Sequence, residues 1–148
     1  MKKCCKSIDI TDINFIIPCI MDCFKGKWKR KEVRNLLIAH DPTLTKGQIN
    51  FYNDVRDYYP FRKAIKHMAL EVSHNIKNHS VSLPPTHSFI RVDSNSGKGR
   101  KLTQETMEHQ VYEYIAVNGL EELLHKKVSP NQIACIKKRG EKYGVQKT

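Results

Sequence analysis

The sequence lacks any apolar run long enough to cross a membrane. Its longest apolar stretch, around Ile16, is interrupted by Pro18 and bounded by Asp12 and Asp22, far short of the roughly 20 residues that span a bilayer. The basic N-terminus has neither the apolar core nor the small-residue cleavage site of a signal peptide. We therefore expect a soluble protein of the cytoplasm with no membrane partner.

Motifs of the common enzyme classes are also missing. There is no Gly-x-Ser-x-Gly, His-Glu-x-x-His, P-loop or dinucleotide fingerprint, and the seven histidines are scattered. A two-metal phosphoryl-transfer centre needs carboxylates on rigid strands, and no apolar strand-like run here carries an aspartate. The residues themselves therefore predict no catalytic site, no metal site and no cofactor.

Cysteine is present in an odd number, five, which favours reduced thiols over a disulfide framework. A zinc site built from Cys4, Cys5, Cys19 and Cys23 is conceivable, but adjacent cysteines are poor joint ligands of one ion. We expect small structural thiols and keep a metal-binding protein as the weakest alternative.

Positive charge is abundant. The 148 residues carry 26 Lys and Arg against 15 Asp and Glu, a net charge of +11. Such an excess is typical of proteins that bind nucleic acid, although it can also do no more than keep a protein soluble.

Helical spacing of apolar residues predicts a mainly α protein. We expect helices over residues 8–24, about 33–40, 45–58, 61–76 and about 105–126. Pro18 predicts a kink or break in the first helix. Thr45 is the expected N-terminal cap of the third helix, and Thr103 or Thr106 is the expected cap of the last helix. With the hairpin described next, the fold class is mainly α with a small β-hairpin (α+β).

After the fourth predicted helix, the sequence pattern changes from helical to strand-like. Residues 81–86 contain two adjacent prolines and cannot be helical. Residues 88–92 are β-branched and aromatic, residues 93–99 are turn-forming, and residues 100–102 resume a strand-like pattern. This order predicts a β-hairpin with a long, mobile, basic tip.

Two sets of cations are candidate binding residues. Around the hairpin tip, arginine forks and the close approach that Gly97 and Gly99 allow suit nucleotide phosphates, with the candidates Arg91, Lys98, Arg100 and Lys101. The alternative is a solvated turn that binds nothing specific. For nucleic acid the candidates are Lys27, Trp28, Lys29, Arg30, Lys31, Lys137, Lys138 and Arg139. Anchoring of the loop to the core is the more ordinary role for a single tryptophan.

The order of several short motifs resembles the opening of a reverse transcriptase of the bacterial and phage branch, which includes group II intron, retron-like and defence-associated enzymes. The motifs are FIRV (89–92), SGKGRKL (96–102), EHQVYEYIAVNGL (108–120) and IACIKKRG (133–140). The resemblance implies a helical N-terminal extension over residues 1–82 and an incomplete fingers region, hairpin plus long helix, over residues 83–148.

The resemblance also implies roles for the cations. Arg100 matches the fingers arginine that contacts the triphosphate of the incoming nucleotide, and Arg91 or Lys98 matches the second basic residue of that hairpin. Lys101 and the cluster at residues 137–139 would face template or nucleotide. The implied partners are RNA or DNA as template-primer and, in a full enzyme, a deoxynucleoside triphosphate.

The family's catalytic palm has no counterpart here. The strand with the first catalytic aspartate and the Tyr-x-Asp-Asp turn are missing, and the sequence stops about where the palm should begin. Without those carboxylates Mg²⁺ cannot be held, so we expect the chain to be inactive alone. It is then part of a polymerase or a remnant kept for binding. The alternative is a free-standing basic RNA- or DNA-binding or adaptor protein, from a phage or a bacterium, without enzymatic activity.

Overall fold

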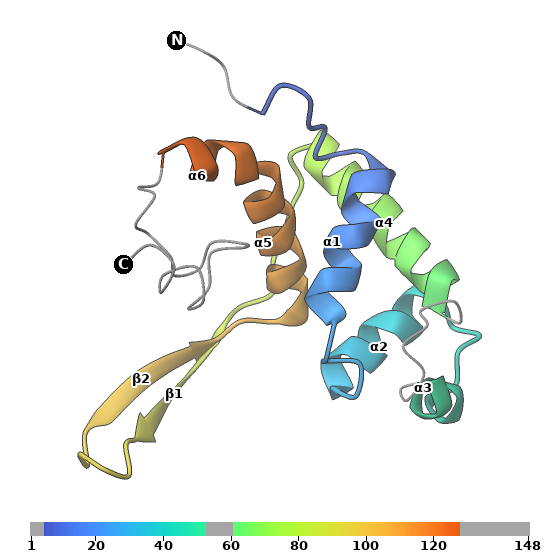
Figure 1. The fold of residues 1–148 in the computed structure, drawn as a ribbon. Helices are drawn as coiled ribbons and strands as arrows, with labels where there is room; N and C mark the ends of the chain where they lie inside the picture. Colours follow the sequence, from blue (N-terminus) through green and yellow to red (C-terminus); the bar gives the residue numbers. More distant parts are fainter. Residues whose placement is uncertain (1–4, 53–60, 128–148) are drawn as a thin grey trace, which may run out of the picture. The chain divides into compact units, whose positions relative to one another are not determined.

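The structure, a computed structural model, describes residues 5–52 and 61–127, with the backbone alone for residues 50–52. The described residues form six helices and one two-stranded antiparallel hairpin: α1 (Ile13–Phe24), α2 (Lys31–His40), α3 (Lys46–Tyr52), α4 (Arg62–Lys77), β1 (His87–Val92), β2 (Gly99–Gln104), α5 (Met107–Gly119) and α6 (Glu121–Lys127) (Figure 1). The predicted fold class, mainly α with a small β-hairpin, is confirmed. Within the described ranges, no helix combines the length and apolarity that crossing a membrane requires.

The chain divides into two compact units. The larger comprises Asp9–Asn118, and the smaller joins Met1–Ile8 to Gly119–Thr148. The predicted boundary between residues 82 and 83 falls inside the larger unit. The reason is that α5 buries Met107, Val111 and Ile115 in the same apolar core as the helices that precede the hairpin.

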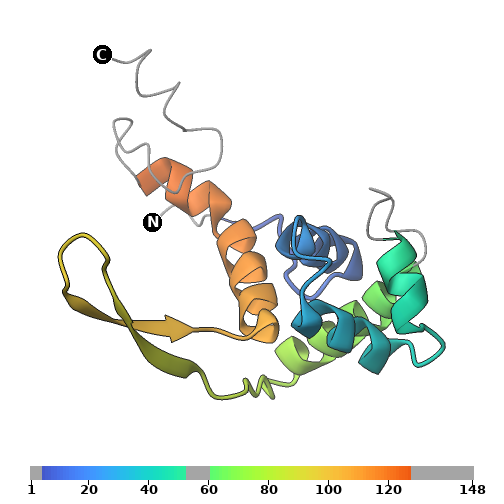
Figure 2. The ribbon, with the colours of Figure 1, turned by 90° about the horizontal axis from the view of Figure 1, so that it is seen from below.

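The core of the larger unit lies among α1, α2, α4 and α5. The apolar stripe predicted for residues 61–76 is buried at every position but its last, and α1 contributes a second stripe at helical spacing. In both ribbon views α4 runs alongside α1 and α2 (Figures 1 and 2). The buried residues of α1 are Ile16, Cys19, Ile20, Cys23 and Phe24.

The first helix begins later than predicted. Residues 8–12 are not helical, because Asp9 accepts hydrogen bonds from the backbone N–H (2.9 Å) and the hydroxyl (2.6 Å) of Thr11 and so holds a turn. Asp12 then caps α1 by accepting the N–H of Asn14 at 3.0 Å. Pro18 lies inside an uninterrupted α1.

The third helix has its predicted cap. The Thr45 hydroxyl accepts the N–H of Gln48 at 3.2 Å, and the Gln48 side chain accepts the N–H of Thr45 at 2.9 Å. This reciprocal pair is a capping box. The part of the predicted helix beyond Tyr52 lies outside the described residues.

The single helix predicted over residues 105–126 is wrong. The structure has two helices, and the break falls at Leu120, directly after Gly119, a weak helix former. Thr106 caps α5, because its hydroxyl accepts the N–H of His109 at 3.3 Å. In the smaller unit, Glu122 of α6 forms an ion pair with Lys126, one turn further along the helix. Its side chain also accepts the backbone N–H of Cys5 at 2.8 Å.

Candidate nucleic-acid interface

The hairpin is closed by a short, well-bonded loop. The N–H of Asp93 donates to the carbonyl of Lys98 at 3.0 Å, and the N–H of Gly97 donates to the carbonyl of Asp93 at 2.8 Å. Gly97 has a φ of +65°, a conformation that costs glycine little and other residues more. These bonds fix the register of the two strands.

The register sorts the hairpin side chains onto two faces, because successive residues of a strand point to opposite sides. One face, here called the arginine face, pairs Arg91 with Arg100, Phe89 with Leu102, and His87 with Gln104. The opposite face, here called the isoleucine face, pairs Ile90 with Lys101, Val92 with Gly99, and Ser88 with Thr103. The hydroxyls of the last pair lie 3.2 Å apart.

The arginine face concentrates positive charge at one cross-strand position. Arg91 and Arg100 are direct partners, and like charges in that arrangement repel each other. Both line a shallow recess of about 400 Å³ that Asp93 also lines. Arg91 makes no ion pair with any residue that the structure describes. The recess therefore presents an arginine pair that an anion would stabilise.

Asp93 organises the recess, whereas the sequence analysis predicted for it only a role in the turn. One carboxylate oxygen, Oδ1, accepts the N–H of Asn95 at 3.0 Å, and the other, Oδ2, lies 3.3 Å from Nη2 of Arg100. The Arg100 side chain is 71% exposed, so this ion pair is open to solvent. Counting strand positions outward from the turn would have placed Asp93 beside Arg100.

The four predicted phosphate ligands are not all brought together. Arg91 and Arg100 share the arginine face, whereas Lys101 lies on the isoleucine face opposite Ile90. Lys98 belongs to the loop, where its N–H points to the Ser96 hydroxyl at 3.4 Å. The structure thus separates a two-arginine site from a lysine on the opposite face and a lysine in the loop.

Every residue of both strands is exposed. That includes apolar side chains on both faces, with Phe89 42%, Ile90 74% and Val92 64% exposed. A two-stranded hairpin alone is only marginally stable in water, and exposed apolar side chains favour contact with a partner. In both ribbon views the hairpin extends away from the helices of its unit (Figures 1 and 2).

The basic run at residues 27–31 is partly engaged within the protein. Nζ of Lys27 donates to the Gln110 side chain at 2.8 Å and lies 5.7 Å from the centre of the Tyr114 ring. The Trp28 ring stacks on Phe61, with centroids 5.4 Å apart, and forms a T-shaped contact with Phe24. These contacts tie the loop to the core. The exposed side chains of the run are Lys29, Arg30 and Lys31.

Other predicted positions fall elsewhere. Lys137, Lys138 and Arg139 lie outside the described residues, as do Cys4 and Cys135. Cys19 and Cys23 are buried thiols that form no disulfide, and Cys5 is half-buried. Within residues 5–52 and 61–127, no three histidine, cysteine or acidic side chains gather as a metal site.

Comparison with protein-family models, with curated proteins and with solved structures gives no match for this chain. The resemblance to reverse transcriptases therefore rests on the sequence motifs at residues 89–140.

Proposed function

We propose that this chain is the N-terminal part of a reverse transcriptase, and that its hairpin binds the phosphates of template-primer and of the incoming nucleotide. The observation that carries the proposal is the direct pairing of Arg91 with Arg100 on an exposed face. The order of the sequence motifs supports the family assignment, and the arginine pair supports phosphate binding.

A phosphate fits the arginine pair for physical reasons. Each guanidinium offers a fork of N–H donors to phosphate oxygens. An anion that is hydrogen-bonded to both arginines would offset the repulsion between them. Phe89 lies on the same face, next to Arg91 along the alternation of β1, and its exposed ring can stack on a base or sugar. The arginine face therefore offers a contact for the phosphates of a nucleotide and another for its base or sugar.

Catalysis is assigned to a palm that these residues do not include. We expect Mg²⁺ to bind only where palm aspartates are present, and this chain to bind without polymerising. Cys19 and Cys23 are buried thiols that form no disulfide, which fits a reducing compartment, so we place this activity in the cytoplasm.

The test is triphosphate binding by the full chain. Replacing Arg100 by alanine should weaken binding of a fluorescent deoxynucleoside triphosphate by about 1–3 kcal/mol, because one charge-assisted contact is lost. Arg100→Lys should recover part of that loss, since it restores the charge but not the fork. Equilibrium fluorescence anisotropy measures both variants.

The matched control is Lys46→Ala, which removes an exposed cation of the same unit outside the hairpin. It should leave the affinity unchanged. Equal affinities for the wild type and Arg100→Ala would refute the role of the arginine pair in nucleotide binding.

A second candidate function is free-standing RNA or DNA binding without a polymerase. It is favoured by cations outside the hairpin, because Arg30 and Lys31 are exposed beside the loop that Trp28 anchors. This candidate predicts tight, strongly salt-dependent binding of RNA or DNA and indifference to nucleoside triphosphates. The triphosphate measurement thus separates the two functions.

A further inference from the structure

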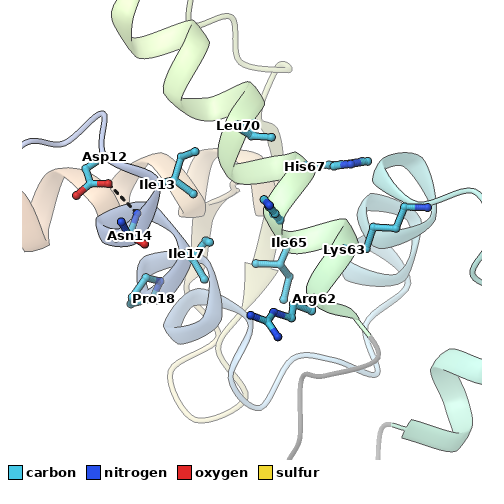
Figure 3. A pocket seen from close by; sticks show the side chains of 11 residues that line it. Asp12, Ile13, Asn14, Ile17, Pro18, Arg62, Lys63, Ile65, His67 and Leu70 are labelled. Carbon is cyan, nitrogen blue, oxygen red and sulfur yellow. Dashed lines mark hydrogen bonds between the residues drawn. The ribbon is translucent and has the colours of Figure 1, made fainter.

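A large groove lies between α1 and α4, away from the hairpin. Its volume is about 1150 Å³, and both helices belong to the larger unit. Figure 3 shows the α1 side chains on one wall and the α4 side chains on the other. The residues that line it are Asp12, Ile13, Asn14, Ile17, Pro18, Arg62, Lys63, Ile65, Lys66, His67 and Leu70.

One end of the groove is apolar. Ile13 and Ile17 lie one turn apart on α1 and are only half-buried, and Leu70 of α4 is 44% exposed. Among the described residues that line the groove there is no Phe, Tyr or Trp. Aliphatic side chains left in water at this spacing match the leucine or isoleucine stripe of an incoming helix.

The other end is basic. Arg62 and Lys66 are exposed, stand one turn apart on α4 and continue the stripe that ends at Leu70. Neither makes an ion pair with a described residue. Their neighbours are engaged, because Lys63 lies 3.6 Å from Asp41 and Nδ1 of His67 lies 3.0 Å from the carbonyl of His40.

The α1 wall adds a polar group. Pro18 has no N–H, so the carbonyl of Asn14, four residues earlier, lacks its usual helical donor. Both residues line the groove, and Figure 3 shows them on the same wall. A backbone acceptor that α1 does not use therefore belongs to a residue of this wall.

We propose that this groove binds an acidic amphipathic helix of a partner protein. Its apolar side chains would cover Ile13, Ile17 and Leu70, and its carboxylates, one turn apart, would pair with Arg62 and Lys66. Among the described residues that line the groove, the His67 imidazole is the one aromatic ring, and the His40 carbonyl engages it at 3.0 Å. The half-buried aliphatic end at Ile13 and Ile17 offers a phosphate backbone no hydrogen-bond donor. A protein helix therefore fits better than a nucleic acid, and the proposal is independent of the function proposed for the hairpin.

The test uses a synthetic probe and the full chain. The probe is a fluorescein-labelled alanine-based helix with leucines one turn apart near one end and glutamates one turn apart near the other. We expect saturable binding, weaker by about tenfold for a twin peptide with glutamine in place of glutamate. The double variant Arg62→Glu, Lys66→Glu should lose about as much affinity for the glutamate peptide. Leu70→Asp should weaken both peptides.

The control double variant, Lys25→Glu with Lys46→Glu, makes the same change in net charge at exposed positions outside the groove. Circular dichroism confirms that each variant is folded. Equal loss of binding in both double variants, or equal binding of the two peptides, would overturn the proposal. So would an oligouridylate that binds the wild type but not Arg62→Glu, Lys66→Glu while the peptide does not bind, because the groove would then be a nucleic-acid site.

Discussion

At the scale of residues, Asp41 illustrates how a loop after α2 is held. Its side chain is buried and accepts hydrogen bonds from the Thr43 hydroxyl at 2.5 Å and the Thr43 N–H at 3.2 Å. The hydroxyl bond lowers the pKa of Asp41 below its ordinary value, helped by the Thr43 N–H and by Lys63. The folded chain thus prefers the ionised carboxylate more strongly than the unfolded chain does.

The sign of the resulting pH dependence follows. A lowered pKa in the folded state adds stability above the unfolded pKa of about 3.9, and that stability is lost as the pH falls towards the folded pKa. We predict that Asp41→Asn lowers the melting temperature at neutral pH and flattens its fall between about pH 5 and pH 3. Thermal unfolding followed by circular dichroism measures this. The exposed Asp22→Asn serves as control, and identical pH profiles for all three chains would contradict the prediction.

Cys23 lies on the buried face of α1, and burial raises its pKa to about 11. Its thiol is therefore protonated at pH 8 and a poor nucleophile. We predict that iodoacetamide alkylates Cys23 slowly in the native protein and rapidly in urea, whereas the half-buried Cys5 is the more accessible of the two in the native protein. Peptide mass spectrometry quantifies both. Fast native labelling of Cys23 would mean that this part of the core is not packed as described.

At the scale of elements, α1 contains an internal proline that the surrounding packing tolerates. Pro18 is exposed and removes one helical hydrogen bond. We predict that Pro18→Ala raises the free energy of unfolding by about 1–3 kcal/mol, since alanine restores the donor and favours the helix. Urea unfolding measures this. An unchanged or lower stability would show that the proline ring contributes packing which the structure does not reveal.

The elements also show how far sequence reasoning reaches. Apolar spacing predicted α2 and α4, and the Thr45 cap and the hairpin with its turn were predicted from local residue chemistry. The start of α1 was missed because the Asp9 side chain competes for the backbone at Thr11. The break after Gly119 was missed because apolar residues continue at helical spacing beyond it.

The sequence predicted which residues belong to the candidate site but not how they are arranged. All four hairpin cations were identified from the sequence, but their division between two faces depends on the register, and the register depends on the bond from Asp93 to Lys98. A shift by one residue would have moved Arg100 to the opposite face. The groove between α1 and α4 was not foreseen at all, because it joins stripes from helices that are distant in the sequence.

At the scale of the whole molecule, the net charge of +11 attracts any polyanion. The proposed function assigns a specific share of phosphate binding to the arginine face. Each phosphate contact with a single strand contributes about −0.7 to the slope of the logarithm of the binding constant against that of the salt concentration. Two lost contacts should therefore flatten the slope by about 1.4, whereas a charge that acts only at long range changes it less.

The most direct test is a salt titration of single-stranded RNA binding by the full chain, with Arg91→Ala, Arg100→Ala beside the control Lys25→Ala, Lys46→Ala. Both double variants remove two exposed cations, so a purely non-specific attraction would affect them equally. We predict weaker binding and a slope flatter by about 1.4 for the arginine variant alone. Equal slopes in the two double variants would contradict the claim that the hairpin arginines hold phosphates.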